Sequence, residues 1–125
     1  MAAAWYNHLT KSKDADSVGT IVDEPEETLG ERSLAHPGAS YAVDVMNDVG
    51  VAMAGSKRTQ LTPTMLHRYD FVINMAGAQY SPEWLTSAPN YQFWDIDDPM
   101  GKSYELTAVA RDRIKQKVVE LIKQT

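Results

Sequence analysis

The chain has 125 residues, enough for one domain with a single hydrophobic core. Its formal net charge of -5 excludes the broad basic surface that non-specific nucleic-acid binding requires, and no apolar run has the length of a membrane span. It has no cysteine, so it offers no disulfide, no thiolate ligand for a metal and no thiol nucleophile. Because no export signal is recognisable, we expect a cytoplasmic protein that binds neither nucleic acid nor membrane.

The first third of the chain alternates helical and extended patterns. Apolar residues at every fourth position predict a helix over residues 1–9. The β-branched run at 18–22 predicts a short strand. The acidic stretch that follows, residues 23–36, is interpreted as an exposed loop. The basic pair Lys57-Arg58 is likewise interpreted as a solvated turn, although it could contact an anion.

Two further helices are expected in the middle of the chain. The first begins after Pro37-Gly38 and ends at Gly50, which is placed to adopt a left-handed conformation. Its buried face has the helical spacing of Ala42, Val45, Met46 and Val49. Thr62-Pro63 is typical of the start of a helix, which is expected to continue to His67.

The second half of the chain has two apolar runs, at 71–75 and 91–94, that predict strands. Ser81-Pro82 between them is typical of a helix start. Ser103 is expected to cap a long final helix, whose buried stripe would contain Leu106, Ala110, Ile114, Val118, Leu121 and Ile122. The alternation predicts an α/β fold, with a parallel sheet and helices on both faces.

Several segments, taken in order, share one resemblance. They are the first helix, Asp16–Thr20, His36-Pro37, the helix and turn over 42–51, the basic turn Ser56–Thr62, the strand Tyr69–Ile73, the dipeptide Asp98-Pro99, and Arg111–Ile114 in the last helix. Together they resemble the low-molecular-weight protein tyrosine phosphatase family, including its arsenate reductase relatives. The resemblance implies a three-layer α/β fold. It also implies that the family's first strand and its phosphate-binding Cys-x5-Arg-Ser loop are missing, which would leave unpaired strand edges and an uncovered apolar trough.

The resemblance assigns a chemical role to one residue. In the family a cysteine thiolate attacks phosphorus and an aspartic acid protonates the leaving oxygen, and Asp98 matches that acid. Its alternative role is that of a turn residue before Pro99. Trp94 and Tyr104 flank the acidic loop and are candidates for lining a substrate pocket, although Trp94 could equally belong to the core and Tyr104 could equally be exposed.

The histidines have no metal-ligand spacing and the glycines form no phosphate-binding loop, so we expect no metal and no cofactor. The substrate implied is phosphotyrosine or another small phosphoester. The chain is expected to be one domain over residues 1–125, incomplete at its N-terminus and inactive as written. Met1 could be internal to a longer gene, the missing strand could come from another chain or from self-association, or the sheet could have rearranged.

Two other functions remain open. One is arsenate reduction with an external thiol once the domain is complete, since a relay among several protein cysteines is excluded. The other is a non-catalytic interaction module on the same scaffold.

Overall fold

The structure is a computed structural model that describes residues 1–22, 27–38, 40–97 and 101–124. The α-helices are α1 (Ala2–Thr10), α2 (Leu29–Ala35), α3 (Ala42–Asn47), α4 (Glu83–Thr86) and α5 (Tyr104–Gln124). Two 3-10 helices, η1 (Pro63–Arg68) and η2 (Ala78–Tyr80), flank the first strand, and the strands are β1 (Val72–Asn74) and β2 (Tyr91–Phe93). Among the described residues, no helix combines the length and the hydrophobicity that a membrane span requires.

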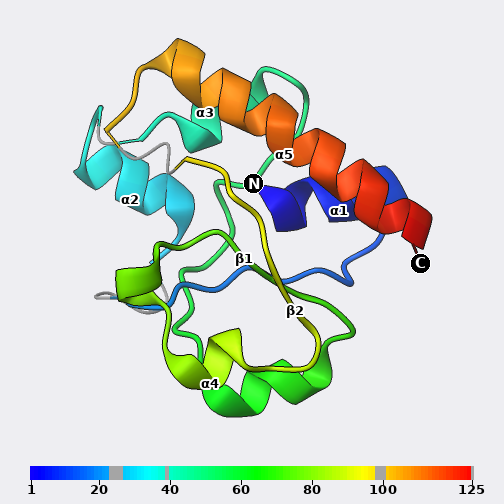
Figure 1. Cartoon of the computed structure of the whole chain (residues 1–125). Helices are drawn as coiled ribbons and strands as arrows, with labels where there is room; N and C mark the ends of the chain where they lie inside the picture. Colours follow the sequence, from blue (N-terminus) through cyan, green and yellow to red (C-terminus); the bar gives the residue numbers. More distant parts are fainter. Residues whose placement is uncertain (23–26, 39, 98–100, 125) are drawn as a thin grey trace.

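The strands β1 and β2 pair in parallel, with Val72 opposite Tyr91 and Asn74 opposite Phe93. Helices α1, α3 and α5 lie on one side of this pair, and η1 and α4 lie on the other (Figure 1). Alternate residues of β1 serve the two sides, because successive side chains of a strand point to opposite faces. Ile73 packs against the core under α1 and α5, whereas Val72 packs against Leu66 and Leu85. The expected α/β fold with helices on both faces is confirmed.

The long helix α5 covers most of the larger core. Ser103 caps it as predicted, since its Oγ accepts a hydrogen bond from the Leu106 amide at 3.2 Å. Leu106 itself was wrongly assigned to the buried stripe, because its side chain is 56% exposed and Thr107 is fully buried instead. Successive residues of an α-helix are rotated by about 100° around its axis. Leu106 is therefore rotated by about 120° from the buried Val118, whereas Thr107 is rotated by only about 20° from it and lies on the same face.

Residues 18–22 do not form the predicted strand. Gly19 makes only an isolated bridge to Gln60, in which its amide donates to Thr59 O at 2.9 Å and its carbonyl accepts from Leu61 N at 2.8 Å. The β-branched composition favours a strand, but a strand also requires a paired neighbour on which to extend its ladder, and here the chain bends at residues 20 and 21.

The acidic stretch 23–36 is not a loop throughout, since it contains α2. A capping box starts this helix: Thr28 Oγ1 accepts from the Glu31 amide at 3.1 Å, and Glu31 Oε1 accepts from the Thr28 amide at 3.4 Å. Just before it, Glu27 accepts a hydrogen bond from Arg58 at 3.1 Å. The basic pair is therefore not a simple solvated turn, because Arg58 is mostly buried and paired with a carboxylate.

Candidate functional site

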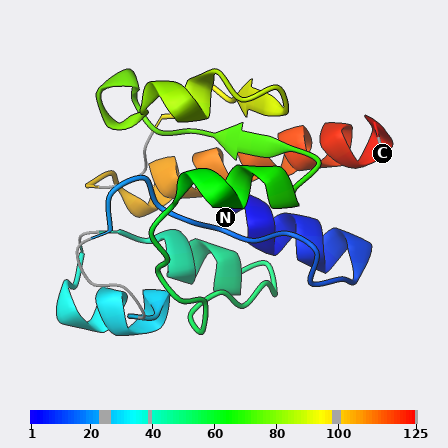
Figure 2. The same cartoon turned by 90° about the horizontal axis from the view of Figure 1, so that it is seen from below.

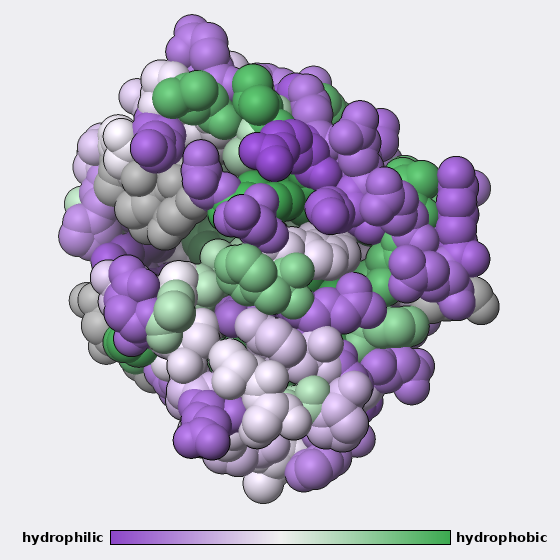
Figure 3. Space-filling view, viewed as in Figure 1, coloured by the Kyte–Doolittle hydropathy of each residue, from purple (hydrophilic) through white to green (hydrophobic). Residues whose placement is uncertain are grey.

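A trough with a volume of about 1160 Å³ opens beside the parallel strands. Its lining comes from the whole of β1 and the residues on either side of it, from the carboxyl end of β2, from residues 14–21, and from the first residues of α1. In Figure 3, hydrophobic surface interrupts the hydrophilic surface near the middle of the molecule. Asp95 and Asp97, both exposed, line the trough where the chain leaves β2. Open α/β sheets bind ligands at this end of their strands.

The loop after β1 is held by a buried asparagine that the sequence analysis overlooked. Asn74 is 6% exposed, and its Nδ2 donates to Ser81 Oγ at 2.9 Å and to Tyr91 Oη at 3.2 Å. Its Oδ1 accepts from the Ala76 amide at 3.0 Å. Ser81 was expected to cap α4, but the structure gives it this bridging role and no side chain caps that helix. The sequence did contain a signal for the role of Asn74, because it is a single polar residue at the end of an apolar strand.

The amino end of α1 lies in the middle of the molecule, where Met1 borders the trough (Figures 1 and 2). Burial lowers the pKa of the Met1 amino group below its ordinary value. The first amides of a helix have no partner within the helix and carry the positive end of its dipole, which favours a nearby anion.

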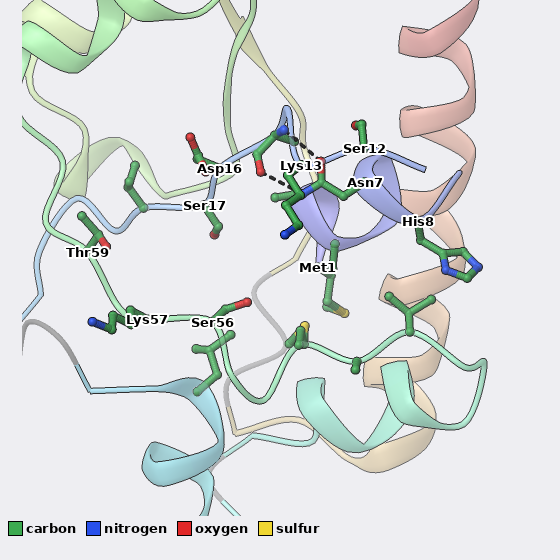
Figure 4. Close-up of a pocket in the computed structure, with 18 of the residues that line it drawn as sticks. Met1, Asn7, His8, Ser12, Lys13, Asp16, Ser17, Ser56, Lys57 and Thr59 are labelled. Carbon is green, nitrogen blue, oxygen red and sulfur yellow. Dashed lines mark hydrogen bonds between the residues drawn. The ribbon is translucent and has the colours of Figure 1, made fainter. Parts of the chain in front are cut away.

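A second cavity of about 680 Å³, the side pocket, is also lined by residues 15–18. Figure 4 shows how Asn7 fixes this segment, with its side chain bonded to both the amide and the carbonyl of Ala15 at 2.9 Å. Tyr69 Oη also donates to Asp16 Oδ2 at 2.5 Å. This hydrogen bond, followed by burial and the charge of Asp16, raises the pKa of Tyr69. Lys13, Lys57 and Arg68 contribute positive charge to the lining.

The structure brings together only some of the predicted site residues. Asp98 lies outside the described residues. Trp94 is 6% exposed and packs in the larger core, although it also reaches the trough. Tyr104 is partly buried and makes an edge-on ring contact with Tyr41 at 5.8 Å, away from the lining of both cavities. Within the described ranges, no three His, Asp or Glu side chains gather as metal ligands would.

The fold and the trough define a three-layer α/β domain with a ligand-accessible edge at the carboxyl ends of its parallel strands. No established family profile matches the sequence. The chain is 31% identical over 94 residues to a glutaredoxin arsenate reductase of Synechocystis sp., a match that covers 74% of this chain and 69% of the relative. It therefore belongs to the low-molecular-weight protein tyrosine phosphatase and arsenate reductase-like family.

A solved structure supports the fold independently. Vibrio vulnificus Wzb in complex with benzylphosphonate superposes with a TM-score of 0.74 at 20% sequence identity, and the match covers 99% of this chain and 88% of Wzb. The predicted fold is thus confirmed for the described residues.

Proposed function

We propose that this chain carries the acid-bearing loop and part of the substrate pocket of a phosphomonoesterase. The reaction would be that of the phosphatases in its family. A cysteine thiolate attacks phosphorus, the ester oxygen leaves with a proton from an aspartic acid, and water then hydrolyses the cysteinyl phosphate. Because this sequence has no cysteine, the proposal assigns the nucleophile to residues outside these 125.

One observation carries the proposal. The amino end of α1, the carboxyl ends of β1 and β2, and the loop of Asp95 and Asp97 all border the same trough. A phosphoryl group held at a helix amino end with a carboxylic acid beside it has the two stabilising elements that the reaction requires, a site for the oxyanion and a proton donor.

We propose Asp98 as the general acid, since it follows Asp97 directly in the sequence. Trp94 and Tyr104 are proposed as candidates for contact with the organic part of the substrate. Of the two, Trp94 is better supported because it reaches the trough, whereas Tyr104 would require the chain around it to move.

A small aromatic phosphoester, or phosphotyrosine, is the substrate class we propose. The benzylphosphonate bound by Wzb supports this choice, because it joins a phosphonate to one aromatic ring. We further propose that residues 1–125 act as one domain and that the protein works in the cytoplasm.

Arsenate reduction with an external thiol is the second candidate. The Synechocystis relative, a glutaredoxin arsenate reductase, is the observation that favours it. Both candidates use the same oxyanion site. They differ in the group that attacks the covalent intermediate, which is water in the phosphatase and an external thiol in the reductase.

Restoring the nucleophile distinguishes the two candidates and tests the acid. A strand and a Cys-x5-Arg-Ser loop of the family's pattern would be joined in front of Met1. The fusion would be assayed with p-nitrophenyl phosphate and, separately, with arsenate plus glutathione and glutaredoxin. We expect phosphate release, slowed about 100-fold or more by Asp98→Asn because general acid catalysis is lost.

Two controls make the result decisive. Circular dichroism would establish that the fusion and its variants are folded, and Asp95→Asn would serve as the matched carboxylate. Equal rates for the Asp98 and Asp95 variants would refute the role of Asp98. Arsenate reduction without phosphate release would favour the second candidate.

A further inference from the structure

Two aromatic side chains beside the trough are half exposed. Tyr80 in η2 and Phe93 at the end of β2 are both 52% exposed, and both line the trough. Neither belongs to the two clusters in which hydrophobic side chains of the described residues pack together. Sites that bind small organic molecules are lined mainly by apolar and aromatic side chains with a few polar groups. The two rings are therefore placed to contact a ligand rather than to hold the fold together.

The register of the sheet places Phe93 on the face that carries η1 and α4. Tyr91 packs on that face, together with hydrophobic residues of the two helices. Phe93 follows Tyr91 by two residues, so its side chain points to the same side of the sheet. Asn74 lies directly opposite Phe93 in the paired strands. The last residues of both strands thus meet at the carboxyl end of the sheet.

The buried amide of Asn74 connects this end of β2 with the loop that carries Tyr80. Its Nδ2 donates to Tyr91 Oη at 3.2 Å and to Ser81 Oγ at 2.9 Å. Ser81 directly follows Tyr80, and its hydroxyl donates in turn to the Gly77 carbonyl at 3.0 Å. A buried amide that loses its partners is costly, so these hydrogen bonds resist displacement of the loop. The bridge from Asn74 therefore fixes Tyr80 relative to β2.

We infer that Tyr80 and Phe93 contact the organic group of the substrate, and that Asn74 is a positioning residue that holds Tyr80 in place. The inference rests on the proposed function, because it takes the phosphoryl group to lie at the amino end of α1, which borders the same trough. An aromatic ester group would bury apolar area against the two rings, whereas inorganic phosphate has no such area to bury. Tyr80 and Phe93 thus determine which phosphoester binds, and not how its phosphoryl group is held.

Two phosphonates that differ by one ring measure this contact. Benzylphosphonate, the ligand of Wzb, and methylphosphonate share the phosphonate group, but only the first has a phenyl ring. Calorimetric titration of both into the fusion that carries the restored loop gives the ratio of their affinities. We expect Tyr80→Ala and Phe93→Ala each to lower that ratio about fivefold or more, with the affinity for methylphosphonate unchanged.

Trp84→Ala is the matched control for the loss of an aromatic ring. Trp84 is 39% exposed and does not line the trough, so its removal should leave the ratio of affinities unchanged. An unchanged ratio in either of the two trough variants, or an equal fall in Trp84→Ala, would overturn the inference.

Ser81→Ala tests the bridge without placing a new group in the core. It should lower the ratio of affinities about threefold or more, again with methylphosphonate binding unchanged. It should also speed amide hydrogen exchange in residues 76–80 of the 125-residue protein. Ser87→Ala is the matched control, because the Ser87 hydroxyl donates to the Glu83 carbonyl at 2.7 Å and does not line the trough. Equal effects of the two serine variants would contradict the positioning role of Asn74.

Failure of this inference can be distinguished from failure of the proposed phosphatase activity. Binding that depends on the two rings, without phosphate release from p-nitrophenyl phosphate, would refute the activity alone. Phosphate release by a fusion that binds both phosphonates equally would refute the contacts of Tyr80 and Phe93 alone. Binding of neither phosphonate would overturn both proposals.

Discussion

Tyr69 connects the segment before β1 with residues 14–18, and both line the trough. It immediately precedes the segment leading into β1, and its hydroxyl bonds Asp16 on the facing extended segment. Asn7 holds the same segment from α1 through Ala15. These side chains explain how residues 14–18 keep a defined position although no strand of the described part of the chain pairs with them.

The raised pKa of Tyr69 predicts a pH dependence of stability. Its pKa is near 10 in the unfolded chain and higher in the folded one, because the phenol donates to Asp16. Above about pH 10 the unfolded state loses the proton first, so the contribution of this bond falls as the pH rises through the folded pKa. Tyr69→Phe should therefore lower the free energy of unfolding near neutral pH, and its difference from the original protein should shrink above about pH 10.

Urea unfolding at a series of pH values measures this difference. Tyr80→Phe is the matched control, since Tyr80 is 52% exposed and no hydrogen bond of its hydroxyl is seen in the described region. A Tyr69 difference that stays constant across pH 10, or one equal to that of Tyr80, would show that the hydroxyl contributes nothing there.

Helix α2 shows how a short element is specified by its first turn. It has seven residues and no buried side chain, so packing gives it little support. The reciprocal bonds of Thr28 and Glu31 supply partners for two amides that the helix cannot pair itself.

Removing that cap should destabilise the protein by about 1 kcal/mol. Thr28→Ala tests this, with Thr62→Ala as its control, because Thr62 precedes η1 in the same position but makes no capping bond. Denaturant unfolding followed by circular dichroism gives both values. Equal losses for the two variants would mean that the cap of α2 does not stabilise it.

The elements that periodicity predicted were those with a buried face. Helices α1, α3 and α5 were found this way, whereas strands β1 and β2 were found from their apolar runs. Gly50 adopts the expected left-handed conformation with φ of 78°. Helix α2 was missed because its composition is polar, although Thr-x-x-Glu was visible in the sequence. The strand at 18–22 could not have been judged locally, since its pairing depends on residues far along the chain.

At the scale of the whole molecule, the order of motifs predicted the family, which the Synechocystis relative confirms. Less of the site could be predicted, because its geometry depends on buried polar contacts. The bridge from Asn74 to Ser81 and Tyr91 joins residues that no spacing rule relates. Trp94 illustrates the same limit, since its position in the sequence suggested a pocket whereas its burial also makes it part of the core.

The central claim is that these residues form the scaffold of the family without its nucleophile. Its most direct test is the release of p-nitrophenol from p-nitrophenyl phosphate by the purified 125-residue protein. We predict a rate equal to that of buffer alone, because no thiolate is available in this chain. Turnover that copurifies with the folded protein would contradict the account, since it would require a nucleophile other than cysteine.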